Sequence, residues 1–250
     1  MNAQQLQQQG NAALFRGQFD NAIQYYRQSM LISSQDVSVG LQDHFHDDND
    51  SESMVDVARD IAATPTAAQP VMESISLDLQ QIIMTTSCET ISSHNIFDLF
   101  DRAFQNLPNA SAAVSSVVCI YNIALTHHTR SMLRTDNSAH HFQRAHHFYR
   151  LAWKALLSCS QQKQVHPSDQ ALLQEPTLLP VMLALLNNMG HIACHFWEKA
   201  DVEAALHGML KVLPYYLEHH VANLCHPDVQ FFYSYRSYEY VDAMNHAPSA

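Results

Sequence analysis

The stretch "LQQQGNAALFRGQFDNAIQYYRQSM", residues 6–30, decides the fold because it has the pattern of two short helices joined by a tight turn. Gly10 and Ala22 are small residues at the positions where two such helices would approach each other most closely. Gly17 lies at the turn between them, and Tyr26 follows about one helical turn after Ala22. The stretch therefore predicts an antiparallel pair of helices.

Two later stretches repeat this arrangement. Their small positions are Ala124 and Ala145 in residues 111–160, and Gly190 and Ala205 in residues 177–217. The pattern resembles the tetratricopeptide repeat, a helix pair of about 34 residues. The small positions are 12, 21 and 15 residues apart in the three copies, so copies two and three need longer first helices or a larger loop. The resemblance implies an all-α fold, a short irregular α-solenoid of antiparallel helix pairs.

The second half of the chain carries a further resemblance. Its signatures are "YNIALTHH" (121–128), "LLNNMGHI" (185–192), the aromatic pair Phe231 and Phe232, and the terminus "HAPSA" (246–250). In this ordering the chain is similar to an uncharacterised family of tetratricopeptide-like proteins of unicellular algae. That resemblance supports the fold and implies no known activity.

The chain is expected to form one domain made of six segments. These are a first repeat (1–36), an acidic disordered insertion (37–73), an extended segment plus a short amphipathic helix (74–110), two further repeats (111–160 and 177–217), and an aromatic C-terminal segment (218–250). Apolar residues alternate in 74–83, which predicts a strand, while their spacing in 95–106 predicts the helix. The aromatic residues 229–236 are β-prone, so we expect them to pair with 74–83 as a small extended segment.

Composition and charge restrict the classes of function. The net charge is −11, with 24 acidic and 13 basic residues and no dense basic cluster, which argues against nucleic-acid binding. No run of apolar residues is long enough to span a membrane, and no export signal opens the sequence. The five cysteines have no CxxC spacing, as expected of free thiols in the cytoplasm, with the nucleus as the alternative location.

Histidines are dense in "SAHHFQRAHHFYRLAW", residues 138–153, but their spacing does not suit a metal site on one helix. His140 and His147 are the one cross-pair on a common face, and they lie about 10 Å apart along the axis. We therefore expect His146 and His147 to be partly exposed polar residues beside a packed seam. The same is expected of the pairs at 127–128 and 219–220.

A better-spaced cluster lies in "GHIACHFWEKAD", where His191, Cys194, His195 and Glu198 stand at i, i+3, i+4 and i+7. On a helix they would share one face, and their side chains are ligand types that zinc accepts. A metal-binding protein or metalloenzyme is therefore the alternative hypothesis. However, zinc proteases need Glu directly after the first His, and Ile192 stands there. The favoured interpretation is a polar groove without a metal or other cofactor.

The preferred hypothesis is a protein–protein interaction or scaffold module that binds a peptide or helix of a partner on its concave face. No catalytic motif is present, so we expect no enzyme activity. The candidate partner-binding residues are Asn11, Leu14, Phe15, Leu125, His128, His191, Cys194 and His195. The sequence leaves assembly into a homo-oligomer open.

Asparagines recur in the predicted first helices at Asn11, Asn122 and Asn188. A clamp for an acidic peptide terminus would need Lys or Arg beside them, but Gln7 and Tyr121 stand where a base would help. Binding of acidic tails is therefore not expected, and the asparagines are predicted to support the repeats themselves.

Overall fold

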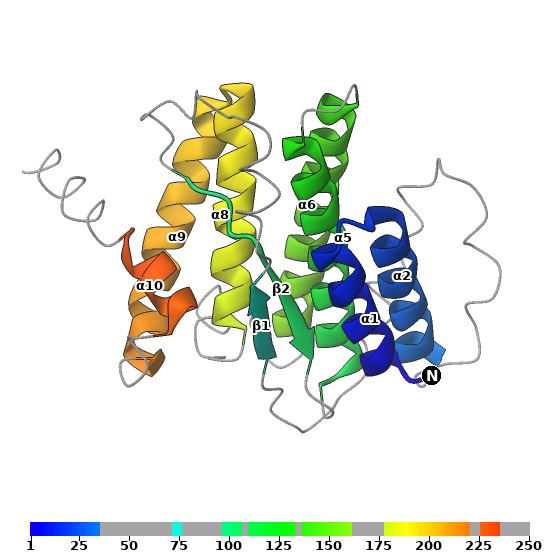
Figure 1. The fold of residues 1–250 in the computed structure, drawn as a ribbon. Coiled ribbons are helices and arrows are strands. Elements are labelled where there is room, and N and C mark those ends of the chain that lie inside the picture. The colour runs from blue at the N-terminus through cyan, green and yellow to red at the C-terminus, as the bar shows by residue number, and fades with distance from the viewer. Residues whose placement is uncertain are drawn as a thin grey trace, which may run out of the picture. The chain divides into compact units, whose positions relative to one another are not determined.

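The computed structural model describes residues 1–35, 72–76, 97–106, 110–133, 137–161, 178–220 and 226–235. These residues are mostly helical (Figure 1). They divide into two compact units, the first with α1, α2, β1, β2, α5 and α6, and the second with residues 97–100, α8, α9 and α10. The predicted acidic insertion lies outside the described residues up to residue 71.

The first unit is built on two helix pairs. Helix α1 (Ala3–Phe15) packs along α2 (Phe19–Gln35), and α5 (Ala112–Met132) packs along α6 (Ser138–Gln161), while α2 also contacts α5. Helix α1 begins at a capping box in which Asn2 and Gln5 exchange hydrogen bonds of 2.8 and 3.0 Å. Gly17 has φ of +70° in the turn to α2, as the sequence predicts.

Small residues let the paired helices of this unit approach each other. A Cβ atom on Gly10 would lie 2.5 Å from the ring of Tyr26 on α2, so a larger side chain would displace that buried ring. Ala22 and Ala145 are both fully buried. In the second copy, α5 continues further past its small position, the loop is longer, and α6 begins further ahead of Ala145; together these account for the wider spacing of the small positions.

The first unit also contains a two-stranded antiparallel sheet. Strand β1 (Met72–Ser76) pairs with β2 (Arg102–Asn106) in a register that places Ser74 opposite Phe104. A strand near 74–83 was expected, but its predicted pairing with 229–236 is wrong. The amphipathic helix predicted over 95–106 is also wrong, because residues 97–106 are non-helical and end in β2. Their apolar residues fit helical spacing, yet an extended backbone buries them and also finds hydrogen-bond partners.

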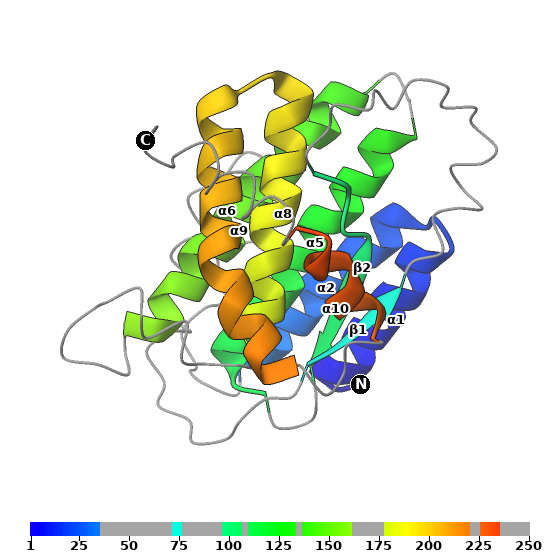
Figure 2. The ribbon, with the colours of Figure 1, turned by 90° about the vertical axis from the view of Figure 1, so that its left-hand side faces the viewer.

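The second unit contains α8 (Leu179–Phe196), α9 (Lys199–His220) and α10 (Pro227–Tyr233). Helix α8 packs along α9, as Figure 2 shows, and α10 also contacts α9. The predicted extended segment at 229–236 is thus largely helical. His226 caps α10 by accepting a hydrogen bond from the backbone N–H of Asp228, and Pro227 suits the first helical position. These start signals outweigh the β-propensity of the aromatic residues.

None of the helices in the described ranges is both long and apolar enough to cross a membrane.

Trp197, between α8 and α9, adopts a left-handed backbone conformation with φ of 59° and is 91% exposed. A non-glycine residue there costs about 1 kcal/mol or more. We therefore expect Trp197→Gly to raise the free energy of unfolding, measured in urea, by about 1 kcal/mol. The matched control is Gly17→Ala, because Gly17 also has a positive φ and an added Cβ would meet only open space. This variant should lower the free energy of unfolding by a similar amount. A Trp197→Gly variant no more stable than the wild type would contradict the expectation.

Candidate functional site

Residues 97–106 are held to the helices by hydrogen bonds between helix side chains and the segment's own backbone. We call these residues the clamped segment. The bonded backbone groups belong to the even-numbered residues 98, 100, 102, 104 and 106. Alternation is the property of an extended chain, whose successive residues direct their N–H and C=O groups to opposite edges. Within each unit, the helices therefore bind one edge of an extended stretch of chain.

In the first unit the central contact is between Asn122 of α5 and Phe104. The Phe104 N–H donates to Asn122 Oδ1 at 3.0 Å, and Asn122 Nδ2 donates back to the Phe104 carbonyl at 2.8 Å. Asn11 of α1 donates to the same carbonyl at 3.5 Å and accepts a 2.7 Å bond from the Tyr26 hydroxyl. One amide side chain thus satisfies both backbone groups of one strand residue.

Weaker contacts flank this pair along β2. The N–H of Asn106 donates to Gln7 Oε1 at 3.2 Å, and its carbonyl accepts a 3.4 Å bond from Gln4. On the other side, the Tyr121 hydroxyl donates to the carbonyl of Arg102 at 3.2 Å. Strand β1 pairs with the opposite edge, so β2 lies between a strand and a row of helix side chains.

The second unit repeats the two-bond contact. The Phe100 N–H donates to Asn188 Oδ1 at 2.9 Å, and Asn188 Nδ2 donates to the Phe100 carbonyl at 3.0 Å. The carbonyl of Asp98 accepts a 2.7 Å bond from Asn187, and its N–H donates to the Tyr235 hydroxyl at 3.2 Å. Asn188 and Asn122, here called the amide clamps, thus make the same contact with residues four positions apart in the chain.

Within the second unit, the side chains of the clamped segment fill apolar positions. Phe97 lies against Gly190 of α8, where a Cβ would come within 2.6 Å of its ring. The absence of a side chain at Gly190 therefore leaves room for the ring of Phe97. The sequence pattern instead predicts that Gly190 leaves room for the second helix of its pair. The ring of Phe100 stacks on Phe232 of α10 with centroids 4.9 Å apart.

Within the first unit, Phe104 packs against Tyr121 with ring centroids 5.1 Å apart. Phe104 and its neighbour Ala103 are both fully or almost fully buried. The apolar side chains of β2 are therefore packed in the core, while its backbone is hydrogen-bonded to helix side chains.

The predicted partner-binding residues do not share one accessible surface. Leu14, Leu125 and His128 are buried, and Asn11 and His191 are at most 9% exposed. Phe15 is 52% exposed at the end of α1, while Cys194 is half-buried and His195 exposed on α8. Of the eight residues, Asn11 is the one that the structure places on the clamped segment.

The prediction that His127 and His128 are surface residues is wrong, because both are buried against α6. The Nδ1 atoms of His127 and His141 are 3.2 Å apart, and His128 Nδ1 is 3.3 Å from the Tyr149 hydroxyl. Burial, with a smaller contribution from nearby positive charges, lowers the pKa of His127 to about 3. The His127–His141 contact requires at least one neutral ring, since one of the two nitrogens must accept.

The histidine and cysteine cluster on α8 is less extended than its spacing predicts. Helix α8 ends at Phe196, so Glu198 follows the left-handed Trp197 and does not continue the helical face. Burial lowers the pKa of His191 to about 4, and burial also lowers that of His195. Within the described ranges, no three His, Cys, Asp or Glu side chains are grouped to hold a metal ion.

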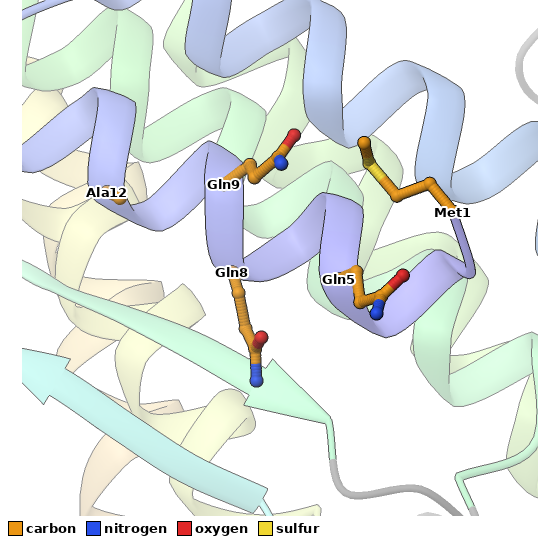
Figure 3. Close-up of a pocket in the computed structure, with 5 residues that line it drawn as sticks. All are labelled: Met1, Gln5, Gln8, Gln9 and Ala12. Atoms are coloured by element: carbon orange, nitrogen blue, oxygen red, sulfur yellow. The ribbon is translucent and has the colours of Figure 1, made fainter.

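A separate depression lies on the outer face of α1 and has a volume of about 570 Å³ (Figure 3). Its lining residues are Met1, Gln5, Gln8, Gln9 and Ala12. Figure 3 shows Gln8 on the side of α1 where β2 runs and Gln9 on another side. The lining has amide and apolar groups but no acid, base or nucleophile, so it offers contacts and no obvious chemistry.

The role of the amide side chains could have been found from the sequence by asking what a buried asparagine bonds to. Asn122, Asn187 and Asn188 stand within apolar helical runs and are fully buried. A buried amide needs several hydrogen-bond partners, and the backbone of its own helix is already paired. The sequence pattern predicts that Asn11, Asn122 and Asn188 support the repeats. It identifies neither Asn187 nor the extended segment that these side chains bind.

No protein-family model, curated protein or solved structure matches this chain. The case for a function therefore rests on the contacts of the clamped segment.

Proposed function

We propose that this protein is an interaction module whose helix pairs bind a partner peptide in extended conformation. The observation that carries the proposal is the pair of amide clamps, each of which bonds both backbone groups of a single residue. Recognition of this kind depends on the backbone and is independent of the side chains at those residues. Main-chain hydrogen bonds supply affinity in strand-type recognition, and pockets for alternate side chains supply specificity.

The proposed architecture is a short irregular solenoid of tetratricopeptide-like helix pairs. In support, three helix pairs are present in the described residues, and the first helix of each pair carries an amide side chain that bonds to the clamped segment. Stacked helix pairs present an inner face to peptides. An extended ligand is favoured over a helical one, because a helix uses its own backbone groups and would leave the amides unsatisfied.

The proposal can be tested by panning displayed random peptides against the full chain. We expect enrichment of peptides rich in aromatic residues over a panning against the bare support. In an isotopically labelled enriched peptide, NMR should show slow exchange of alternate backbone amides in the complex. Protection of consecutive amides would indicate a bound helix and contradict the proposed mode, and a failure to enrich any peptide would contradict the function.

A further inference from the structure

The clamped segment has the contacts of a bound peptide, although it is part of the same chain. The backbone hydrogen bonds described above join the segment to side chains of the helices and of Tyr235, which follows α10. The helix side chains are those of Gln4, Gln7, Asn11, Tyr121, Asn122, Asn187 and Asn188. Ordinary core strands are held by other strands, whereas in the described part of the chain β1 alone pairs with β2, along one edge. In each unit the helix side chains that hold the segment have a hydrogen-bonding pattern complementary to an extended chain.

The buried side chains of the segment indicate which side chains such a surface accepts. Phe97 and Phe100 are at most 1% exposed in the second unit, as are Ala103 and Phe104 in the first. Asp98 between them is exposed. The second unit thus accepts aromatic residues at positions 97 and 100, and the first accepts a small residue at 103 and an aromatic one at 104.

Gly190 is the part of the surface that is specialised for this ligand. Any side chain there would overlap the ring of Phe97, because even a Cβ comes within 2.6 Å of it. The position therefore forms an aromatic-sized recess on α8. Gly10, the matching small residue of the first copy, faces Tyr26 of its own helix pair and forms no such recess for the segment.

We infer that residues 97–106 are an internal ligand, which a partner displaces from a unit by offering an extended segment with an aromatic residue at the amide clamp, as Phe100 has in the second unit and Phe104 in the first. The inference rests on the proposed function. It adds that, without a partner, the chain's own residues 97–106 fill the binding surface. The partner segment should therefore resemble residues 97–106. Each unit holds its own part of the segment, so a partner would have to satisfy Asn188 in the second unit as residue 100 does, or Asn122 in the first as residue 104 does.

The test uses a fluorescent synthetic peptide of residues 95–107 and two full-length chains, wild type and Phe100→Ala. Phe100→Ala weakens the internal ligand and leaves the amide clamps in place. We expect the peptide to bind this variant at least about tenfold more tightly than the wild type, because less internal competition must be overcome. The peptide should also raise the melting temperature of the variant. A control peptide with F97S, F100S and F104S should do neither.

Asn188→Ala in the Phe100→Ala background should reduce peptide binding, since the external ligand then loses a clamp. Equal binding of the peptide to both chains would overturn the inference. So would a Phe100→Ala chain that is folded by circular dichroism but binds no peptide, or one that is unfolded and not rescued by peptide. Both results would make the segment a fixed part of the core.

Two results separate this inference from the proposed function. If peptides selected by panning bind while the 95–107 peptide does not bind Phe100→Ala, the function survives and the internal-ligand inference fails. If light scattering finds a wild-type dimer that is lost in Phe100→Ala, residues 97–106 are exchanged between two copies of the chain. The inference that a different protein supplies the displacing segment then fails.

Discussion

Replacing Asn122 by alanine is expected to lower the free energy of unfolding by about 3 kcal/mol, because it removes two hydrogen bonds to the buried backbone of Phe104. The N–H of Phe104 loses its side-chain partner, and its carbonyl keeps one bond of 3.5 Å from Asn11. Each buried group left unsatisfied costs about 1–3 kcal/mol. Asn188→Ala should have an effect of similar size through Phe100.

The matched control for this prediction is Asn21→Ala, which changes an exposed asparagine on α2. It should change the unfolding free energy by no more than about 0.5 kcal/mol. Urea unfolding followed by circular dichroism measures all three variants. If Asn122→Ala were as mild as Asn21→Ala, water would have to replace the amide in the site, and the clamp would not be a main source of stability.

The second large effect is a loss of stability in acid. Burial lowers the pKa of His127 to about 3 and that of His191 to about 4, whereas an unfolded histidine titrates near 6.5. Between these values the unfolded chain binds more protons than the folded one, so the free energy of unfolding falls as the pH falls below about 6.5. At pH 5 each histidine should lower it by about 2 kcal/mol relative to pH 8.

Urea unfolding at a series of pH values from 8 to 5 checks this prediction. The variant His127→Gln/His191→Gln cannot take up these two protons, so its stability should depend less steeply on pH than that of the wild type. The exposed His219 is the control, and His219→Gln should keep the wild-type dependence. Parallel curves for the wild type and the double variant would contradict the prediction, because they would show that the two rings take up protons as readily in the folded state as in the unfolded state.

The helices were predictable from the sequence because their signals are local. Gly17 at the turn and the small positions Gly10, Ala22 and Ala145 depend on contacts within one helix pair, which a spacing of residues can express. The C-terminal residues 229–233 are helical despite their β-propensity, because capping by His226 and Pro227 overrides it. Boundaries of that kind can be read from start signals that propensity alone ignores.

The extended state of residues 97–106 was not predictable from their own sequence. Their apolar residues suit a helix, and their true conformation is set by Asn122 and Asn188, which lie 18 and 88 residues away from their partners. The burial of His127 and His128 was missed for a related reason, since it depends on α6 covering that side of α5. Contacts between residues far apart in the sequence thus determine the conformation of residues 97–106 and the burial of the two histidines, which local sequence patterns do not predict.

The order in which the protein folds follows from where the clamps lie along the chain. Helix pairs form from neighbouring segments, whereas Asn11 and Phe104 are 93 residues apart and Asn188 and Phe100 are 88 apart. Closing loops of that length carries an entropic cost of about 4 kcal/mol by the usual logarithmic scaling. Residues 97–100 are therefore expected to dock on α8 after that helix has formed, whereas residues 102–106 can reach Asn122, 18 residues away, at an earlier stage. A newly made chain then passes through a state in which the Asn188 clamp is formed and still empty.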